Sequence, residues 1–213
     1  MIKRMTVAMA ALGALLLIGT PRVQAQMDPA PVNLLDALGS GDIYATFYGN
    51  GDESVKGRIR RSAFGPEKIV VEPGTQFWAQ REGLQGMTTL GWVPVDLTRS
   101  NIAYVVIPTA CTNYNLAAPT PLDRMNPVCC PEPRMAALAE QVGRAHPPQE
   151  VAQIAVWAIA NNPQWNEIAG LVEAKVQADS PEERTEAAEA YRVQAVQLLR
   201  AAGVNPTRFR MFR

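Results

Sequence analysis

The sequence has little of what most catalytic sites are built from. It holds a single histidine, His146, and three cysteines among 213 residues. A nucleophile–base pair could use only His146, and no Gly-x-Ser-x-Gly motif supplies a matching serine. Neither a Gly-x-x-x-x-Gly-Lys phosphate-binding loop nor a dinucleotide-binding Gly-x-Gly-x-x-Gly motif occurs. We therefore expect a protein that is not an enzyme and that needs no cofactor.

Net charge is also absent, because 20 Lys and Arg balance 20 Asp and Glu. Nucleic-acid binding needs a basic surface that displaces counterions, so this balance predicts no nucleic-acid partner. The hydrophobic fraction of 47% and the four tryptophans argue against a disordered chain. The length favours one domain, or one domain with an appended subdomain.

One long apolar run occurs, at residues 7–18, and it is shorter than the ~20 residues that a transmembrane helix needs. Two basic residues precede the run, and a proline and then small residues follow it, which is typical of a cleaved signal peptide. We expect a signal peptide over residues 1–25, with cleavage between Ala25 and Gln26. The mature protein would then be periplasmic or extracellular and would not span the membrane.

Export would place Cys111, Cys129 and Cys130 in an oxidising compartment, where thiols pair. Adjacent cysteines rarely bridge each other without strain, so the expected disulfide joins Cys111 to Cys129 or Cys130 and leaves one thiol over. A zinc site made by the three cysteines and His146 is the alternative. No Cys-x-x-Cys spacing supports that site, so we predict no metal.

Residues 26–127 carry the pattern of a β domain. Six short segments there alternate in polarity or are rich in β-branched residues: 43–48, 55–60, 68–72, 75–79, 88–97 and 102–107. Asn50-Gly51-Asp52 separates the first two segments and favours a hairpin, because Asn and Gly tolerate positive φ. Short strands at about ten-residue spacing are typical of a small antiparallel sandwich or barrel, and we expect the sandwich.

Residues 134–213 change to a helical period and predict a packet of about four helices, which gives an α+β protein. The expected helices cover residues 135–144, residues 149–161, a segment from Asn162-Pro163 through Gln177, and a segment from a Ser180–Glu183 capping box to Gly203. The second helix is apolar nearly all round, which predicts that it is buried. The tail, Pro206–Arg213, is either a short strand or docking segment, or a basic-aromatic interaction tail.

Gln153 lies on that buried helix, where an unpaired amide would cost about 1–3 kcal/mol. It therefore needs a partner. One hypothesis is a structural hydrogen bond to the backbone of a β segment, which would tie the helices to the sandwich. The other is an internal thioester, formed when the Cys111 thiolate attacks the side-chain carbonyl carbon of Gln153 and releases ammonia. Cys111 is the natural partner because it follows the last predicted strand.

The segment Ala152–Trp157 resembles the Gln-x-Ala-(Ile/Val)-Trp block of thioester domains in bacterial surface adhesins. A longer pattern resembles a group of secreted bacterial proteins of uncharacterised function, and its matching segments are Pro73-Gly74-Thr75, Gln85-Gly86-Met87, Cys111-Thr112-Asn113 and Gln153–Asn162. The adhesin resemblance implies a covalent adhesion module that uses a Cys111–Gln153 thioester against amines on a partner surface.

Three aromatic side chains are candidates for a ligand surface: Trp78, Trp92 and Tyr114. If Trp78 or Trp92 faces outward beside Tyr114, an aromatic strip for carbohydrate or peptide is expected; otherwise these rings pack in the core.

We therefore expect an exported, non-catalytic binding or structural module, held by one disulfide from Cys111, whose partner is a protein or a cell-envelope surface. The covalent adhesion module is the first alternative, and an enzyme of unrecognised type is the second. A disulfide at Cys111 excludes the thioester, because both use the same sulfur.

Overall fold

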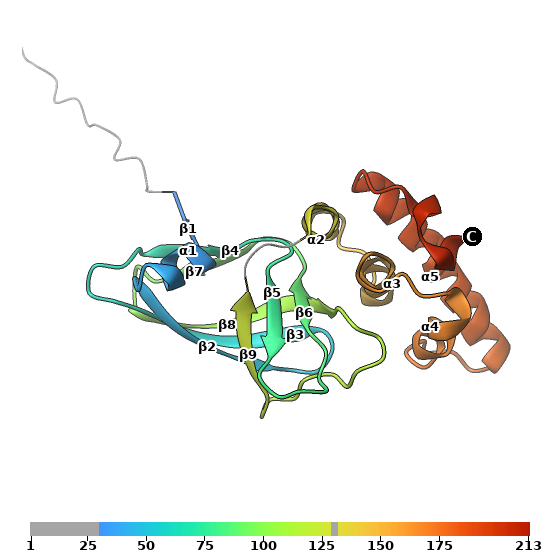
Figure 1. The fold of residues 1–213 in the computed structure, drawn as a ribbon, viewed down its shortest axis with the longest axis horizontal. Coiled ribbons are helices and arrows are strands. Elements are labelled where there is room, and N and C mark those ends of the chain that lie inside the picture. The colour runs from blue at the N-terminus through green and yellow to red at the C-terminus, as the bar shows by residue number, and fades with distance from the viewer. Residues whose placement is uncertain (1–29, 129–131) are drawn as a thin grey trace, which may run out of the picture.

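The computed structural model describes residues 30–128 and 132–213 and shows a β-rich part joined to a helical part (Figure 1). The β-rich part contains β1 (Val32–Asn33), α1 (Leu34–Gly39), β2 (Ile43–Gly49), β3 (Ser54–Arg61), β4 (Lys68–Val71), β5 (Gln76–Ala79), β6 (Met87–Thr89), β7 (Val93–Asp96), β8 (Ile102–Cys111) and β9 (Arg124–Val128). The helical part contains α2 (Pro133–Ala145), α3 (Gln149–Ala160), α4 (Trp165–Glu173), α5 (Pro181–Ala201) and two 3₁₀ turns (Pro206–Arg208 and Arg210–Phe212). The predicted signal peptide lies outside the described residues.

Six antiparallel strands close into a barrel in the order β2-β3-β8-β6-β5-β9. The mixed α+β class is thus confirmed, but the strands form a barrel in place of the expected sandwich. The reason is β9, a short segment outside the six predicted strands, in which buried Met125 lies between exposed Arg124 and Asn126 and is followed by Pro127. It pairs with β2 on one side and with β5 on the other, so the sheet has no free edge at this point.

A second, three-stranded sheet has the order β1-β4-β7, with β1 parallel to β4. Its strand β7 comes from the second half of the segment that we expected to be one strand over residues 88–97. Gly91 divides that segment, because its φ of 89° turns the chain from β6 of the barrel toward β7. Pro94 lies in β7, the edge strand of the small sheet, where a residue without an N–H is tolerated because one side of the strand has no neighbour to bond.

Alternation along each strand places the barrel core. On β3 the side chains of Val55 and Ile59 are buried, whereas Lys56, Arg58 and Arg60 are exposed. Gly57 is also inward, and the ring of Phe47 fills the space beside it: a Cβ at Gly57 would lie 2.6 Å from the Phe47 ring. The barrel interior is therefore filled by side chains.

The helical part packs around α3, whose side chains are buried from Val151 through Ala158. Helices α2 and α5 contact α3, and the apolar cluster that they form extends to Leu90 and Ala110 of the β-rich part. The prediction of a buried second helix is confirmed. Its burial on all sides follows from its place between the barrel and the other helices (Figure 1).

Helix ends match the predicted signals in one case and differ in another. At α5 the Ser180 hydroxyl accepts from the N–H of Glu183 at 3.2 Å, and the Glu183 carboxylate accepts from the N–H of Ser180 at 3.2 Å, so the capping box is confirmed. At α4 the expected cap at Asn162 is wrong. Asn162 has a φ of 49° and follows the end of α3, and Gln164 caps α4 instead.

The C-terminal tail is docked. Phe209 and Met211 are buried in the helical core, and the N–H of Arg210 donates to the side-chain oxygen of Asn162 at 2.7 Å. The tail is therefore a docking segment, and it forms two 3₁₀ turns in place of a short strand.

Candidate functional site

The predicted pair Cys111 and Gln153 meets at the junction between barrel and helices. Strand β3 pairs with β8 only as far as the Ser54–Pro108 register, and β8 runs on to Cys111. Beyond that register the side chain of Gln153 takes the place of a strand. Its Oε1 accepts from the N–H of Cys111 at 2.9 Å, and its Nε2 donates to the carbonyl of Cys111 at 2.7 Å. One amide side chain thus satisfies both backbone groups of Cys111.

Gln149 extends this arrangement by one helical turn. Its Nε2 donates to the carbonyl of Thr109 at 3.0 Å. Because residues four apart lie on one face of a helix, the two glutamines of α3 reach backbone groups two residues apart on β8. The hypothesis of a structural hydrogen bond from Gln153 to a β segment is confirmed. Sequence reasoning missed Gln149, although its spacing of four from Gln153 on an apolar helix was a usable signal.

The sulfur of Cys111 points into the barrel. Its side chain is 1% exposed, and Sγ lies 3.7 Å from the sulfur of Met87 and 3.6 Å from the carbonyl oxygen of Asp52. Burial raises the pKa of this thiol to about 12, outweighing a hydrogen bond from Gln85 that favours the thiolate. The thiol is therefore protonated at neutral pH and is a weak nucleophile.

Cys111 carries a free thiol in this structure. Its two expected disulfide partners, Cys129 and Cys130, lie outside the described residues. The disulfide therefore stays a prediction.

Two further contacts hold the helices on the barrel. Lys175, just after α4, pairs with Asp52 in the turn between β2 and β3, and partial burial lowers the pKa of Lys175. Gly143 of α2 meets Gly91 so closely that a Cβ at Gly143 would lie 2.5 Å from the Cα of Gly91. The helical part is thus attached through side-chain amides, an ion pair and a glycine–glycine contact.

The three predicted aromatic ligand residues do not form one strip. Trp78 is 58% exposed on β5, and Trp92 is 56% exposed beside β7, which belongs to the other sheet. Tyr114 packs edge-on against Trp157, with ring centroids 6.3 Å apart, and its hydroxyl donates to Glu167 at 3.3 Å. Within the described ranges no ring contact joins these three residues.

Trp78 borders a cleft of about 520 Å³ between the two parts of the molecule. The cleft is lined by Trp78, Thr112 and Asn113 from the β-rich part and by Arg134, Met135 and Ile159 from the helices, among others. Its walls combine an indole and aliphatic side chains with many polar groups, four of which are charged: Arg81, Glu82, Glu132 and Arg134. The cleft is therefore more polar than a typical small-molecule site.

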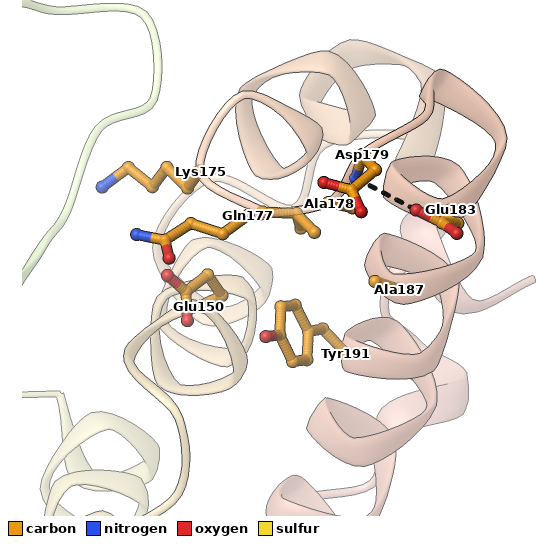
Figure 2. A pocket seen from close by; sticks show the side chains of 9 residues that line it. Glu150, Lys175, Gln177, Ala178, Asp179, Glu183, Ala187 and Tyr191 are labelled. Carbon is orange, nitrogen blue, oxygen red and sulfur yellow. Dashed lines mark hydrogen bonds between the residues drawn. The ribbon is translucent and has the colours of Figure 1, made fainter.

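A larger and more polar cleft, of about 960 Å³, opens between α3, the segment before α5 and α5 itself (Figure 2). Figure 2 shows Glu150 and Tyr191 directed into this space from α3 and α5. The carboxylate of Glu183 is engaged in helix capping, since it accepts from the N–H groups of Asp179 and Ser180. This acid at the cleft therefore serves the start of α5.

Neither a metal site nor a membrane span is found over residues 30–128 and 132–213. No group of three His, Cys, Asp or Glu side chains there is arranged to hold a metal ion. His146 ends α2 on the surface with a φ of 47°. No helix in these ranges has the length and apolar character needed to cross a bilayer.

Comparison with protein-family models, with curated proteins and with solved structures returns no match to this chain. Function is therefore inferred from geometry and chemistry alone.

Proposed function

We propose that the protein is an exported, non-catalytic binding module that holds a cell-envelope partner in the cleft beside Trp78. The observation that carries this proposal is the indole of Trp78, more than half exposed at the rim of a cleft between two firmly joined parts. An exposed tryptophan gains contact area when a ligand covers it and loses little conformational entropy, which is why tryptophan is enriched at binding sites.

The surroundings of Cys111 and Gln153 support a binding function over a catalytic one. Both polar atoms of the Gln153 amide are engaged by the backbone of Cys111, and the Cys111 thiol is buried inside the barrel. These groups stabilise the attachment of the helices. Because that attachment sets the shape of the cleft before any ligand arrives, binding there avoids part of the usual ordering cost.

The test measures two properties: the position of signal-peptide cleavage and binding to the cell envelope. The chain is expressed in its native host, the exported fraction is isolated, and N-terminal sequencing is expected to begin at Gln26. The purified mature protein is then mixed with envelope fragments of that host and sedimented. Trp78→Ala is expected to lower the co-sedimented fraction, whereas Trp92→Ala, a matched change at a similarly exposed tryptophan, keeps it at the wild-type level. An uncleaved chain that stays inside the cell contradicts export. Equal sedimentation of both variants and the wild type contradicts binding in the cleft beside Trp78.

A covalent adhesion module is the second candidate, and one observation favours it: Cys111 and Gln153, 42 residues apart in sequence, lie in contact in buried surroundings. In the reaction Sγ of Cys111 would add to the side-chain carbonyl carbon of Gln153. The new S–C bond replaces the C–N bond, and ammonia leaves with the thiol proton. An amine on a partner would then form an amide with that carbon and release the thiol.

Intact mass separates the two candidates. The binding module is expected to have the full mass of the mature chain, less two hydrogens if the predicted disulfide forms. A mass lower by one ammonia, with no such deficit in Gln153→Ala and with methylamine adding to the wild type, would establish the thioester and overturn the non-catalytic proposal.

A further inference from the structure

The outward surface of β2, β3, β8 and β9, called here the basic face, concentrates positive charge on one side of the barrel. Three cations alternate along β3: Lys56, Arg58 and Arg60, all exposed. Arg124 of β9 adds a fourth, since it lies directly across from Tyr48 in the β2–β9 register. Cations two residues apart on a strand are about 6.7 Å apart, so β3 carries a straight row of charge.

No acid balances this row. The outward positions of the four strands hold neither Asp nor Glu. Within the described residues none of the four cations forms an ion pair, although Arg61, Arg81, Lys175 and Arg192 do. Unpaired like charges side by side raise the free energy of the free protein, and an anionic ligand would remove that cost.

Tyrosines flank the cationic row on both sides. The registers place Arg60 beside Tyr44, Lys56 beside Tyr48, and Arg58 beside Tyr104, which is 79% exposed. Side chains directly across from each other on neighbouring strands are about 5 Å apart at Cβ, so each cation sits next to an aromatic ring. Helices α2 to α5 lie at one end of the barrel (Figure 1), and the exposure of Lys56, Arg58 and Arg60 shows that they do not cover this face.

We propose that the basic face binds an acidic polysaccharide, with the β3 cations on its repeating anionic groups and the rings of Tyr48 and Tyr104 against the faces of its sugars. A straight row of cations fits an extended polymer better than a single anion. Barrel strands carrying aromatic and polar residues are known platforms for oligosaccharides and oligonucleotides.

A polysaccharide is preferred over a single-stranded nucleic acid because the proposed export would place the face among envelope glycans. The guanidinium of Arg60 covers the ring of Tyr44, 5.1 Å from its centroid, so the exposed rings of Tyr48 and Tyr104 are the ones available to sugars. The site is separate from the cleft beside Trp78.

The test uses the full mature chain and four probes: alginate as the polyuronate, dextran as the neutral glycan, an oligothymidylate, and vesicles of phosphatidylglycerol. Calorimetry is expected to show binding to alginate and none to dextran. Affinity should fall steeply between about 0.1 M and about 1 M salt, where the Debye length shrinks from about 10 Å to about 3 Å.

Three variants locate the site. Arg58→Glu is expected to weaken alginate binding about tenfold or more, and Arg58→Gln by a smaller factor. Tyr104→Ala should weaken it several-fold without changing the salt dependence. As the control, Arg200→Glu on α5 makes the same change of net charge far from the face and should leave affinity within about twofold. Thermal unfolding of each variant confirms that it is folded.

Equal affinity of wild type and Arg58→Glu for alginate overturns the proposal, and so does tighter binding to the oligothymidylate or to the vesicles. N-terminal sequencing separates this failure from failure of the proposed export. A mature chain that begins at Gln26 but does not bind alginate supports export and contradicts the proposed binding of an acidic polysaccharide.

Discussion

The barrel and the helical part satisfy their backbone hydrogen-bonding groups in different ways, and this difference explains the contacts at their junction. A helix satisfies its backbone groups internally, whereas a strand needs a neighbour. Where β3 ends, β8 still has unpaired N–H and C=O groups, and the helices have no free backbone to offer. The side chains of Gln149 and Gln153 supply what a strand would have supplied.

Charge is also distributed differently in the two regions. On the helices, cations pair with nearby acids, as in Arg144 with Glu140 and Arg192 with Glu189. On β3, three cations stand in a row without an acidic partner among the described residues. A chain with no net charge can therefore still present a strongly basic surface, because net charge says nothing about where the charges lie.

The largest expected effect comes from changing the amide that joins the regions. Gln153→Glu leaves a carboxylate that cannot donate to the carbonyl of Cys111 and that is buried beside it. We expect the free energy of unfolding to fall by about 3 kcal/mol or more at neutral pH. Acidic pH should restore part of this loss, because the introduced carboxyl group can again donate and accept once it is protonated. Urea denaturation measures both effects.

Gln149→Glu serves as the matched control, since Gln149 makes a single bond and is half-buried. Its loss should be clearly smaller. Equal losses at the two positions would show that Gln153 has no special part in joining the regions.

A steric change at the other side of the junction should have the next largest effect. The added Cβ of Gly143→Ala would lie 2.5 Å from the Cα of Gly91, so α2 or the turn must move. We expect a destabilisation of about 1–3 kcal/mol. Gly170→Ala on α4, where the added Cβ meets nothing within 4 Å, should instead stabilise by up to about 1 kcal/mol. Thermal unfolding of the pair distinguishes crowding from helix propensity; stabilisation by both changes would refute the close contact.

The thiol of Cys111 gives an effect that depends on pH. Its pKa is about 12 in the folded protein against an ordinary 9.0, so the unfolded chain loses the proton first as pH rises. The unfolding free energy should therefore fall above pH 9, by about 1.4 kcal/mol between about pH 8 and pH 10. Cys111→Ala lacks this component. Both are measured with a reductant present, so that Cys111 is a free thiol. Parallel pH profiles of wild type and variant would then show that the thiol is not buried as described.

The ion pair between Lys175 and Asp52 should contribute least, because both side chains are about one-third exposed. Asp52→Asn is expected to cost about 0.5–1 kcal/mol at low salt and almost nothing at about 1 M salt. Guanidinium is unsuitable for this measurement because it is itself a salt, so urea titrations at the two salt concentrations are compared. A cost that does not change with salt would indicate a role other than charge pairing.

Local patterns predicted much of this fold. The alternating segment at residues 55–60 became β3, the apolar helix at 149–161 became α3, and the Ser180–Glu183 box starts α5. Each depends on interactions between residues close in sequence, such as a pleat, a helical period or a cap. The segment Arg124–Val128 alternates only over Arg124, Met125 and Asn126 before Pro127, which is too short a pattern to predict a strand, and its pairing with β2 and β5 makes it one.

For the candidate site too, some features follow from local sequence and others only from the tertiary structure. The sequence alone indicated that a glutamine on a buried helix needs a hydrogen-bonding partner, because an unpaired buried amide is costly. It also determined that the reactive residue types are few. Only the tertiary structure decided that the partner is the backbone of Cys111, that the sulfur turns into the barrel, and that four scattered cations form one face. Those outcomes depend on contacts between residues far apart in sequence, which closure of the barrel brings together.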